Sequence, residues 1–162
     1  MTRRGSIAYY LSAWILGCFF ASVLVWIRDI FAPTLNVPLS RSAFGLLFFY
    51  FYGLLLGALA ALLGGFLLRL IMAALRCKTP THWALAGAIL APVLIIILGI
   101  LGRRIETIRH PDLRLVGLLT LGPKIVLDAG WWLAIPSGAA AAYFLCRIQR
   151  AFAPQQAAAN AP

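Results

Sequence analysis

The chain has 162 residues, of which 63% are hydrophobic and 11% are charged, and its formal net charge at pH 7 is +10. Soluble domains are nearer half apolar and about a quarter charged, and a chain of this length leaves too much surface exposed to hide so many apolar side chains. The composition therefore excludes a water-soluble fold and predicts an integral membrane protein. Its basic residues lie at the ends of apolar runs, where they fit anionic lipid headgroups, and no nucleic-acid-binding motif accompanies them. We expect membrane lipid as a partner and no nucleic acid.

The first predicted transmembrane helix covers residues 7–27, an uncharged stretch that follows Arg3 and Arg4. A secretory signal peptide begins in the same way, but its apolar region is only about 7–15 residues long, so we expect this helix to be retained. Cys18 within it is interpreted as a packing residue, because the three cysteines form no C-x-x-C motif and no disulfide framework. The connection at residues 28–42 contains two prolines, which keep the helix from resuming.

The second predicted helix, residues 43–68, is the longest uncharged run, and we expect it to continue helically to Leu75. It would extend about 39 Å at 1.5 Å per residue, which exceeds the roughly 30 Å hydrocarbon core, so it must tilt. Small residues spaced four apart form its predicted helix-packing face: Gly53, Gly57, Ala61 and Gly65. Such a face lets another backbone approach closely, either as a seam within one bundle or as a dimer face. Arg69, near the end of the run, is expected to snorkel to the headgroups; a buried Arg69 that faces a substrate is the alternative.

The third predicted helix covers residues 83–102 and has Pro92 near its middle, where the missing hydrogen bond should bend it. The link before it, residues 76–82, is so short that the second and third helices must be antiparallel neighbours. Cys77 and His82 in this link are too few for a metal site, which needs three or four ligands.

The longest polar connection, residues 103–128, carries a cluster of basic residues. We predict that four arginines in it contact anionic headgroups: Arg103, Arg104, Arg109 and Arg114. Residues 115–121 are apolar but too short to cross a bilayer, and Gly122-Pro123 is expected to break them, which predicts an interfacial segment. The alternative is a re-entrant segment, in which Lys124 and Asp128 would lie close enough to pair.

Glu106 and His110 in the same connection lie four residues apart, so they would share one face of a helix. That spacing is compatible with acid–base or metal chemistry. Two such residues arise easily by chance in a charged loop, and a solvated loop is the preferred interpretation.

The fourth predicted helix covers residues 129–146, with Trp131-Trp132 as an interfacial anchor and Pro136 as an expected bend. The small-residue spacing recurs here and in the first helix: Ala134, Gly138 and Ala142, and Ala13, Gly17 and Ala21. The tail at residues 151–162, rich in Ala, Gln and Pro, is expected to be disordered. The predicted fold is an all-α integral membrane protein, with one domain at residues 1–150, four transmembrane helices in an antiparallel bundle and one interfacial loop segment.

An even number of spans puts both termini on one side of the membrane. That side would carry six Lys and Arg residues, or seven with Arg69, and the opposite side would carry seven. The positive-inside rule therefore favours neither orientation clearly. Because the first helix often dominates, Arg3 and Arg4 favour cytoplasmic termini. We expect a multi-pass protein of a cell membrane, and specifically of a bacterial inner membrane.

The cores of the predicted spans contain no ionisable residue, which weighs against an ion or proton pathway. The sequence has no P-loop, G-x-S-x-G, H-E-x-x-H or dinucleotide-binding motif, so we expect no catalytic residues, no metal and no cofactor. The first hypothesis is a non-enzymatic accessory, assembly or scaffold protein that acts through helix–helix and lipid contacts, as a homo-oligomer or in a larger membrane complex. The alternative is a small transporter or flippase-like carrier of lipid or apolar cargo, whose basic loop binds anionic headgroups. A lipid-modifying enzyme that uses Glu106 and His110 is the third hypothesis.

Overall fold

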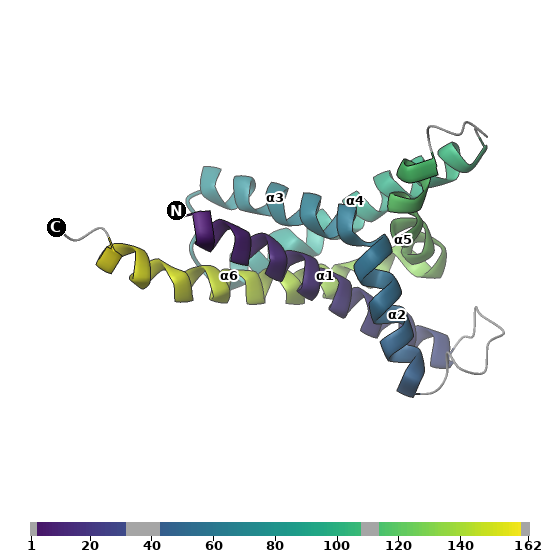
Figure 1. Ribbon diagram of the computed structural model, residues 1–162, viewed down its shortest axis with the longest axis horizontal. Coiled ribbons are helices and arrows are strands. Elements are labelled where there is room, and N and C mark those ends of the chain that lie inside the picture. Colours follow the sequence, from purple (N-terminus) through teal and green to yellow (C-terminus); the bar gives the residue numbers. More distant parts are fainter. Residues whose placement is uncertain (1–2, 32–42, 108–113, 160–162) are drawn as a thin grey trace.

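The computed structural model describes residues 3–31, 43–107 and 114–159, and every regular element in these ranges is a helix. The elements are α1 (Arg3–Phe31), α2 (Ala43–Leu56), α3 (Ala58–Ala74), α4 (Pro80–Thr107), α5 (Arg114–Gly130), the 3-10 helix η3 (Trp131–Leu133) and α6 (Ala134–Ala159). The helices α1, α3, α4 and α6 lie along the long axis of the molecule, whereas α2 and α5 turn away from it at one end (Figure 1). Both chain termini lie at the opposite end (Figure 1).

Two of these helices, α1 and α4, are each long and apolar enough to cross a membrane. Two further pairs pass the same test only in combination: α2 with α3, bent by 67°, and α5 with the following helix, bent by 109°. The described part of the chain therefore has two membrane-capable helices, or up to four if each bent pair is one span. The prediction of an all-helical chain is confirmed for the described residues, and so is that of helices long and apolar enough to cross a membrane; the four-helix antiparallel bundle stays a prediction.

The helix predicted to run unbroken from residue 43 to residue 75 is interrupted at Gly57, so this prediction is wrong. The Gly57 N–H still donates to the Gly53 carbonyl, with the nitrogen and oxygen 2.8 Å apart. A Cβ atom at position 57 would lie 2.6 Å from that same oxygen, so the bend requires glycine there. Trp14 Nε1 on α1 donates to the Leu54 carbonyl at 2.7 Å. This contact stabilises the bend by satisfying a carbonyl at the end of α2.

The interfacial segment predicted to break at Gly122-Pro123 is instead part of α5, which continues through both residues to Gly130. Pro123 is fully buried, and α5 packs closely against α4. A Cβ atom on Gly99 of α4 would lie 3.2 Å from the Pro123 carbonyl oxygen, so the two backbones nearly touch. Packing against a neighbouring helix is what allows a proline within a membrane helix. The chain turns at Gly130, whose φ of 136° is accessible to glycine and strained for other residues.

The last helix, α6, begins later and ends later than the fourth predicted span. Pro136 lies in its first turn, where a proline costs little because the N–H has no helical partner, and the bend predicted at Pro136 lies at Gly130 instead. The helix continues to Ala159, into the tail predicted to be disordered. Alanine and glutamine are good helix formers, which explains why the helix extends beyond the apolar span. α4 runs through Pro92 as one helix.

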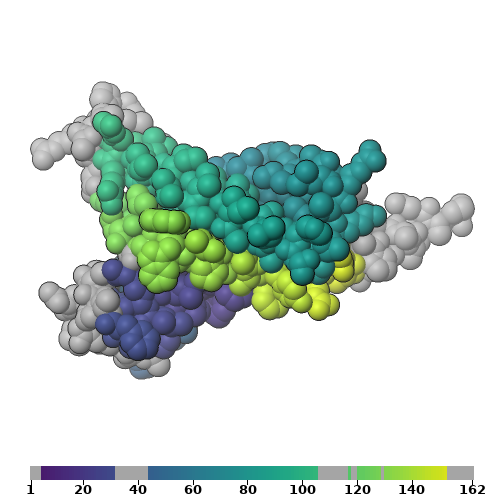
Figure 2. Space-filling view, turned by 180° about the vertical axis from the view of Figure 1, so that it is seen from behind, coloured from purple at the N-terminus to yellow at the C-terminus, as the bar shows by residue number. Residues whose placement is uncertain are grey.

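Seen from behind, α6 lies between α4 and α1 (Figure 2). The terminal core cluster, near the chain ends, contains the buried side chains of Tyr9, Met72, Trp83 and Cys146, one from each of α1, α3, α4 and α6. The rings of Tyr9 and Trp83 meet edge to face with centroids 6.4 Å apart. Large apolar side chains on the outside are exposed, among them Phe44 at 69%, as expected for helices that face lipid.

Candidate functional site

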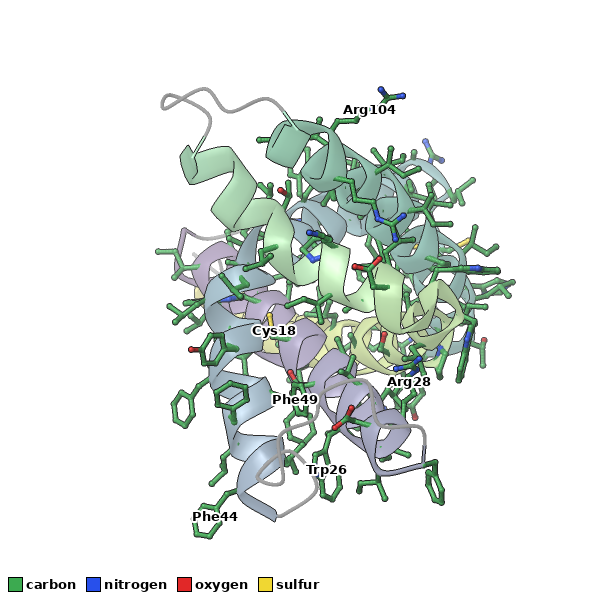
Figure 3. All side chains as sticks on the ribbon, turned by 90° about the vertical axis from the view of Figure 1, so that its right-hand side faces the viewer. Cys18, Trp26, Arg28, Phe44, Phe49 and Arg104 are labelled. Carbon is green, nitrogen blue, oxygen red and sulfur yellow. The ribbon has the colours of Figure 1, made fainter. Side chains whose placement is uncertain are left out.

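The predicted helix-packing face of Gly53, Gly57, Ala61 and Gly65 lies against α1. A Cβ atom on Gly65 would lie 2.7 Å from the Ala13 Cβ, and one on Gly53 would lie 2.6 Å from Ser22 Oγ. Next to Gly57 lies Cys18, whose Sγ would be 3.2 Å from an added Cβ; Figure 3 shows Cys18 between α1 and the α2–α3 pair. The face is therefore a seam within the molecule, and α1 occupies the position that a second copy would take in a dimer.

Polar side chains on α1 reinforce this seam by donating to carbonyl oxygens of the bent pair. Tyr9 Oη donates to Gly65 at 3.0 Å, and Ser22 Oγ donates to Phe49 at 3.0 Å. Together with the bond from Trp14, these contacts fix the register of α1 on both α2 and α3. The buried Tyr9 contact is the one most shielded from solvent.

We expect Tyr9→Phe to lower the free energy of unfolding by about 1 kcal/mol, because it removes a buried hydrogen bond and keeps the ring. Thermal unfolding in mild detergent measures the change. The matched control is Tyr10→Phe, whose hydroxyl only accepts a long 3.4 Å contact from Arg69 Nη1, and which should lower stability by less than about 0.5 kcal/mol. Equal destabilisation by the two variants would contradict the role given to the Tyr9–Gly65 bond.

Arg69, near the end of α3, is held by aromatic rings of α1. Its guanidinium carbon lies 5.5 Å from the centroid of the Tyr9 ring and 5.6 Å from that of Tyr10, which is cation–π distance. Arg69 is half-buried and does not belong to the cavity described below. The geometry gives no support to the alternative in which Arg69 faces a substrate, and snorkelling to the headgroups stays a prediction.

A second seam of small residues joins α4 to α6. A Cβ atom on Gly87 would lie 2.3 Å from the Gly138 carbonyl oxygen and 2.5 Å from the Ala142 Cβ. The reverse also holds, since a Cβ on Gly138 would lie 2.3 Å from the Gly87 oxygen and 2.4 Å from the Ala91 Cβ. The spacing of Ala134, Gly138 and Ala142 that the sequence displays is thus part of a direct backbone contact.

Between these seams lies a cavity of about 580 Å³, lined by residues of all six α-helices. Glycine and alanine make up much of the lining, and most of the rest is large and apolar. Its polar side chains are Ser22, Tyr52, Asp128 and Ser137. Small residues let the helices meet at the seams, but the methyl group of alanine and the hydrogen of glycine are too small to fill the space between the seams. This is the physical origin of the cavity.

The two ends of the cavity differ. At one end Ala13, Leu68, Ala142 and Leu145 belong both to the lining and to the terminal core cluster, which closes the space. At the other end several lining residues of α2 and α5 are exposed, among them Tyr52 at 51% and Asp128, whose side chain is 46% exposed, so the cavity reaches the surface along these two helices.

An ion pair lies at this open end. Asp128 on α5 accepts a hydrogen bond from Arg103 Nη2 on α4, and both side chains are about half exposed. Exposed ion pairs contribute only about 0–1 kcal/mol, so this contact is easily exchanged for another. The structure pairs Asp128 with Arg103, and Lys124, which the re-entrant alternative places close enough to pair with Asp128, lies four residues before it on α5.

The predicted headgroup contacts are distributed unevenly. Arg103 lies beside the cavity opening, and Arg104 is exposed and extends away from α4 (Figure 3). Arg114 begins α5, while Arg109 and His110 lie outside the described residues. The pairing of Glu106 with His110 is therefore a prediction that falls outside the described part of the chain. Sequence reasoning missed the cavity and the Arg103–Asp128 pair, although the small-residue spacing on several spans was a signal of close helix contacts.

Arg28, near the end of α1, adds a further charge at the open end. Its Nη1 atom is buried and has no hydrogen-bond acceptor among the described residues. The described part of the chain holds no group of three or more His, Cys, Asp or Glu residues able to bind a metal ion. Comparison with protein-family models, with curated proteins and with solved structures finds no match to this chain.

Proposed function

We propose that the protein is a non-enzymatic membrane carrier that holds the apolar chain of a lipid-like molecule in its central cavity. The supporting observation is the cavity itself. Protein interiors are close-packed, with few voids larger than a water molecule, whereas sites for small molecules occupy about 300–1,000 Å³. The volume of the cavity, about 580 Å³, lies within the range of small-molecule sites.

The lining favours an apolar occupant over a polar one. Ser22 Oγ donates to the Phe49 carbonyl, and Ser137 Oγ donates to the Ala134 carbonyl at 3.1 Å. The two serine hydroxyls of the lining are thus directed to the backbone, and the other two polar side chains, Tyr52 and Asp128, belong to exposed residues. A hydrocarbon chain needs no hydrogen-bond partner, and the bilayer supplies such chains at high concentration.

The accessory or scaffold role predicted from the sequence stays a prediction. Its proposed contact surface, the face around Gly53 and Gly57, is covered by α1, whereas the carrier role has a specific feature of the structure to support it. We further propose a bacterial inner membrane as the location, with cytoplasmic termini, on the basis of Arg3 and Arg4 before the first span.

The test fills the cavity from α6. Ala141 lines the cavity, and its neighbour Ala140 does not, so Ala141→Phe and Ala140→Phe add the same side chain at adjacent positions. We expect lipid retained by the protein in mild detergent, counted by native mass spectrometry, to fall about tenfold in Ala141→Phe, a change of about 1.4 kcal/mol. Ala140→Phe should retain lipid as the unchanged protein does.

The carrier step is measured with the same variants in vesicles that contain a fluorescent phospholipid. Transfer of the labelled lipid between leaflets should be faster with the protein than in empty vesicles. With Ala141→Phe the transfer rate should equal that of empty vesicles. Thermal unfolding of both variants is the control that tests whether each is folded. Retention of lipid that is equal in Ala141→Phe and Ala140→Phe would refute the proposed function.

A further inference from the structure

At the opening of the cavity, charged side chains lie next to the apolar lining. Asp128 belongs to the cavity lining and at the same time accepts a hydrogen bond from Arg103. The ion pair joins α5 to α4 at the rim, next to a close contact in which a Cβ atom on Gly99 would lie 2.8 Å from Leu127 Cδ2. An amphipathic molecule with its chain in the cavity would therefore have its polar end beside Arg103.

Positive charge is in excess at this end of the molecule. Among residues whose side chains the structure describes, the cations here are Arg28, Arg103, Arg104 and Lys124, and the acids are Asp29 and Asp128. The guanidinium of Arg28 has a buried nitrogen without an acceptor among these residues. An anionic group is the polar end that this charge distribution favours.

We infer that the cavity takes an anionic glycerophospholipid, whose phosphate replaces the Asp128 carboxylate on Arg103. This inference rests on the proposed function, since it assigns the headgroup end of the same site. Guanidinium binds carboxylate and phosphate with the same fork geometry, so a phosphate oxygen can take the position of the Asp128 carboxylate on Arg103. Because both partners are about half exposed, a headgroup reaches Arg103 from the membrane surface.

The experiment measures headgroup preference with the full-length protein in vesicles that contain equal amounts of phosphatidylglycerol and phosphatidylcholine. After extraction in mild detergent, native mass spectrometry gives the ratio of the two lipids retained. We expect Arg103→Gln to lower the ratio of retained phosphatidylglycerol to retained phosphatidylcholine about fivefold. This factor corresponds to about 1 kcal/mol, the contribution of one basic residue to binding at an anionic membrane surface. Asp128→Asn should raise the preference, because it removes the competing carboxylate.

The matched control is Arg104→Gln, which removes the same charge from the next residue of α4 and should leave the ratio unchanged. The double variant Arg103→Gln/Asp128→Asn should behave as Arg103→Gln does, because Asp128 acts on the headgroup only through Arg103. If Arg103→Gln and Arg104→Gln lowered the ratio equally, the assignment of Arg103 would be overturned in favour of a diffuse surface charge.

A free anion is distinguished from a lipid headgroup by competition. Inorganic phosphate and soluble glycerophosphoglycerol, each added at the concentration of the lipid, should displace no phosphatidylglycerol. Displacement by either would overturn the lipid assignment and make the opening a site for free phosphate esters. If Ala141→Phe abolishes retention of both lipids while Arg103→Gln leaves their ratio unchanged, the headgroup inference fails and the carrier proposal stands.

Discussion

Gly87→Ala is expected to lower the free energy of unfolding by about 3 kcal/mol, at the upper end of what overpacking usually costs. The added methyl group would lie 2.3 Å from the Gly138 carbonyl oxygen and 2.5 Å from the Ala142 Cβ. Neither atom is the end of a flexible side chain, so α4 and α6 must separate. Gly87→Leu should leave no folded protein in the membrane. Gly138→Ala should match Gly87→Ala, because it places a methyl group against the same crossing.

Equilibrium unfolding in mixed detergent measures these changes. Gly64→Ala is the control: its methyl group would meet only Leu94 Cδ1, at 3.3 Å, and a side-chain tip can move aside. The better helix propensity of alanine then offsets the contact, and stability should change by less than about 1 kcal/mol. The double variant Gly87→Ala/Gly138→Ala should cost less than the sum of the two single variants, because one separation relieves both contacts. Strict additivity would contradict the shared crossing.

The positions of the most apolar helices followed from the sequence, but those of α5 and of the bends did not. Apolar runs mark where a chain crosses hydrocarbon, and α1 and α4 lie where such runs predict them. A glycine within a run gives no sign of whether the helix stays straight, and the contacts that Trp14 and α5 make at the bend depend on the tertiary structure. At Pro123 and Pro136 the sequence predicted a break or a bend that the structure does not have. Pro123 packs against α4, and Pro136 lies in the first turn of α6, where a proline does not disturb the helix.

The candidate site was predictable only in part, for a related reason. The spacing of Gly53 and Gly57 showed that a backbone approaches, and the structure shows that it is the backbone of α1. A cavity is the space left when several such seams meet, so it depends on the relative placement of all helices. The pairing of Arg103 with Asp128 joins residues 25 positions apart, one on α4 and one on α5, where the sequence predicted a single polar connection with an interfacial segment.

Gly122→Ala is expected to displace α5 and to lower the free energy of unfolding by about 2–3 kcal/mol. The methyl group would lie 2.6 Å from the Leu56 carbonyl oxygen and 2.9 Å from the Gly57 nitrogen, both backbone atoms at the bend between α2 and α3. Because α5 also carries Asp128, its displacement should widen the opening of the cavity. We therefore expect lipid retention to fall together with stability.

Gly117→Ala, on the same helix, separates this effect from a general effect of glycine substitution in α5. Its methyl group would meet only Ile105 Cγ2, at an ordinary 3.6 Å, and alanine favours the helix by about 1 kcal/mol over glycine. Gly117→Ala should thus be as stable as the unchanged protein or slightly more so, whereas Gly122→Ala should unfold at a lower temperature. The opposite signs test the close approach directly, because helix propensity alone would make both variants more stable. If Gly122→Ala were the more stable protein, α5 would not rest on the bend at Gly57, and the cavity would lack the wall that α5 provides.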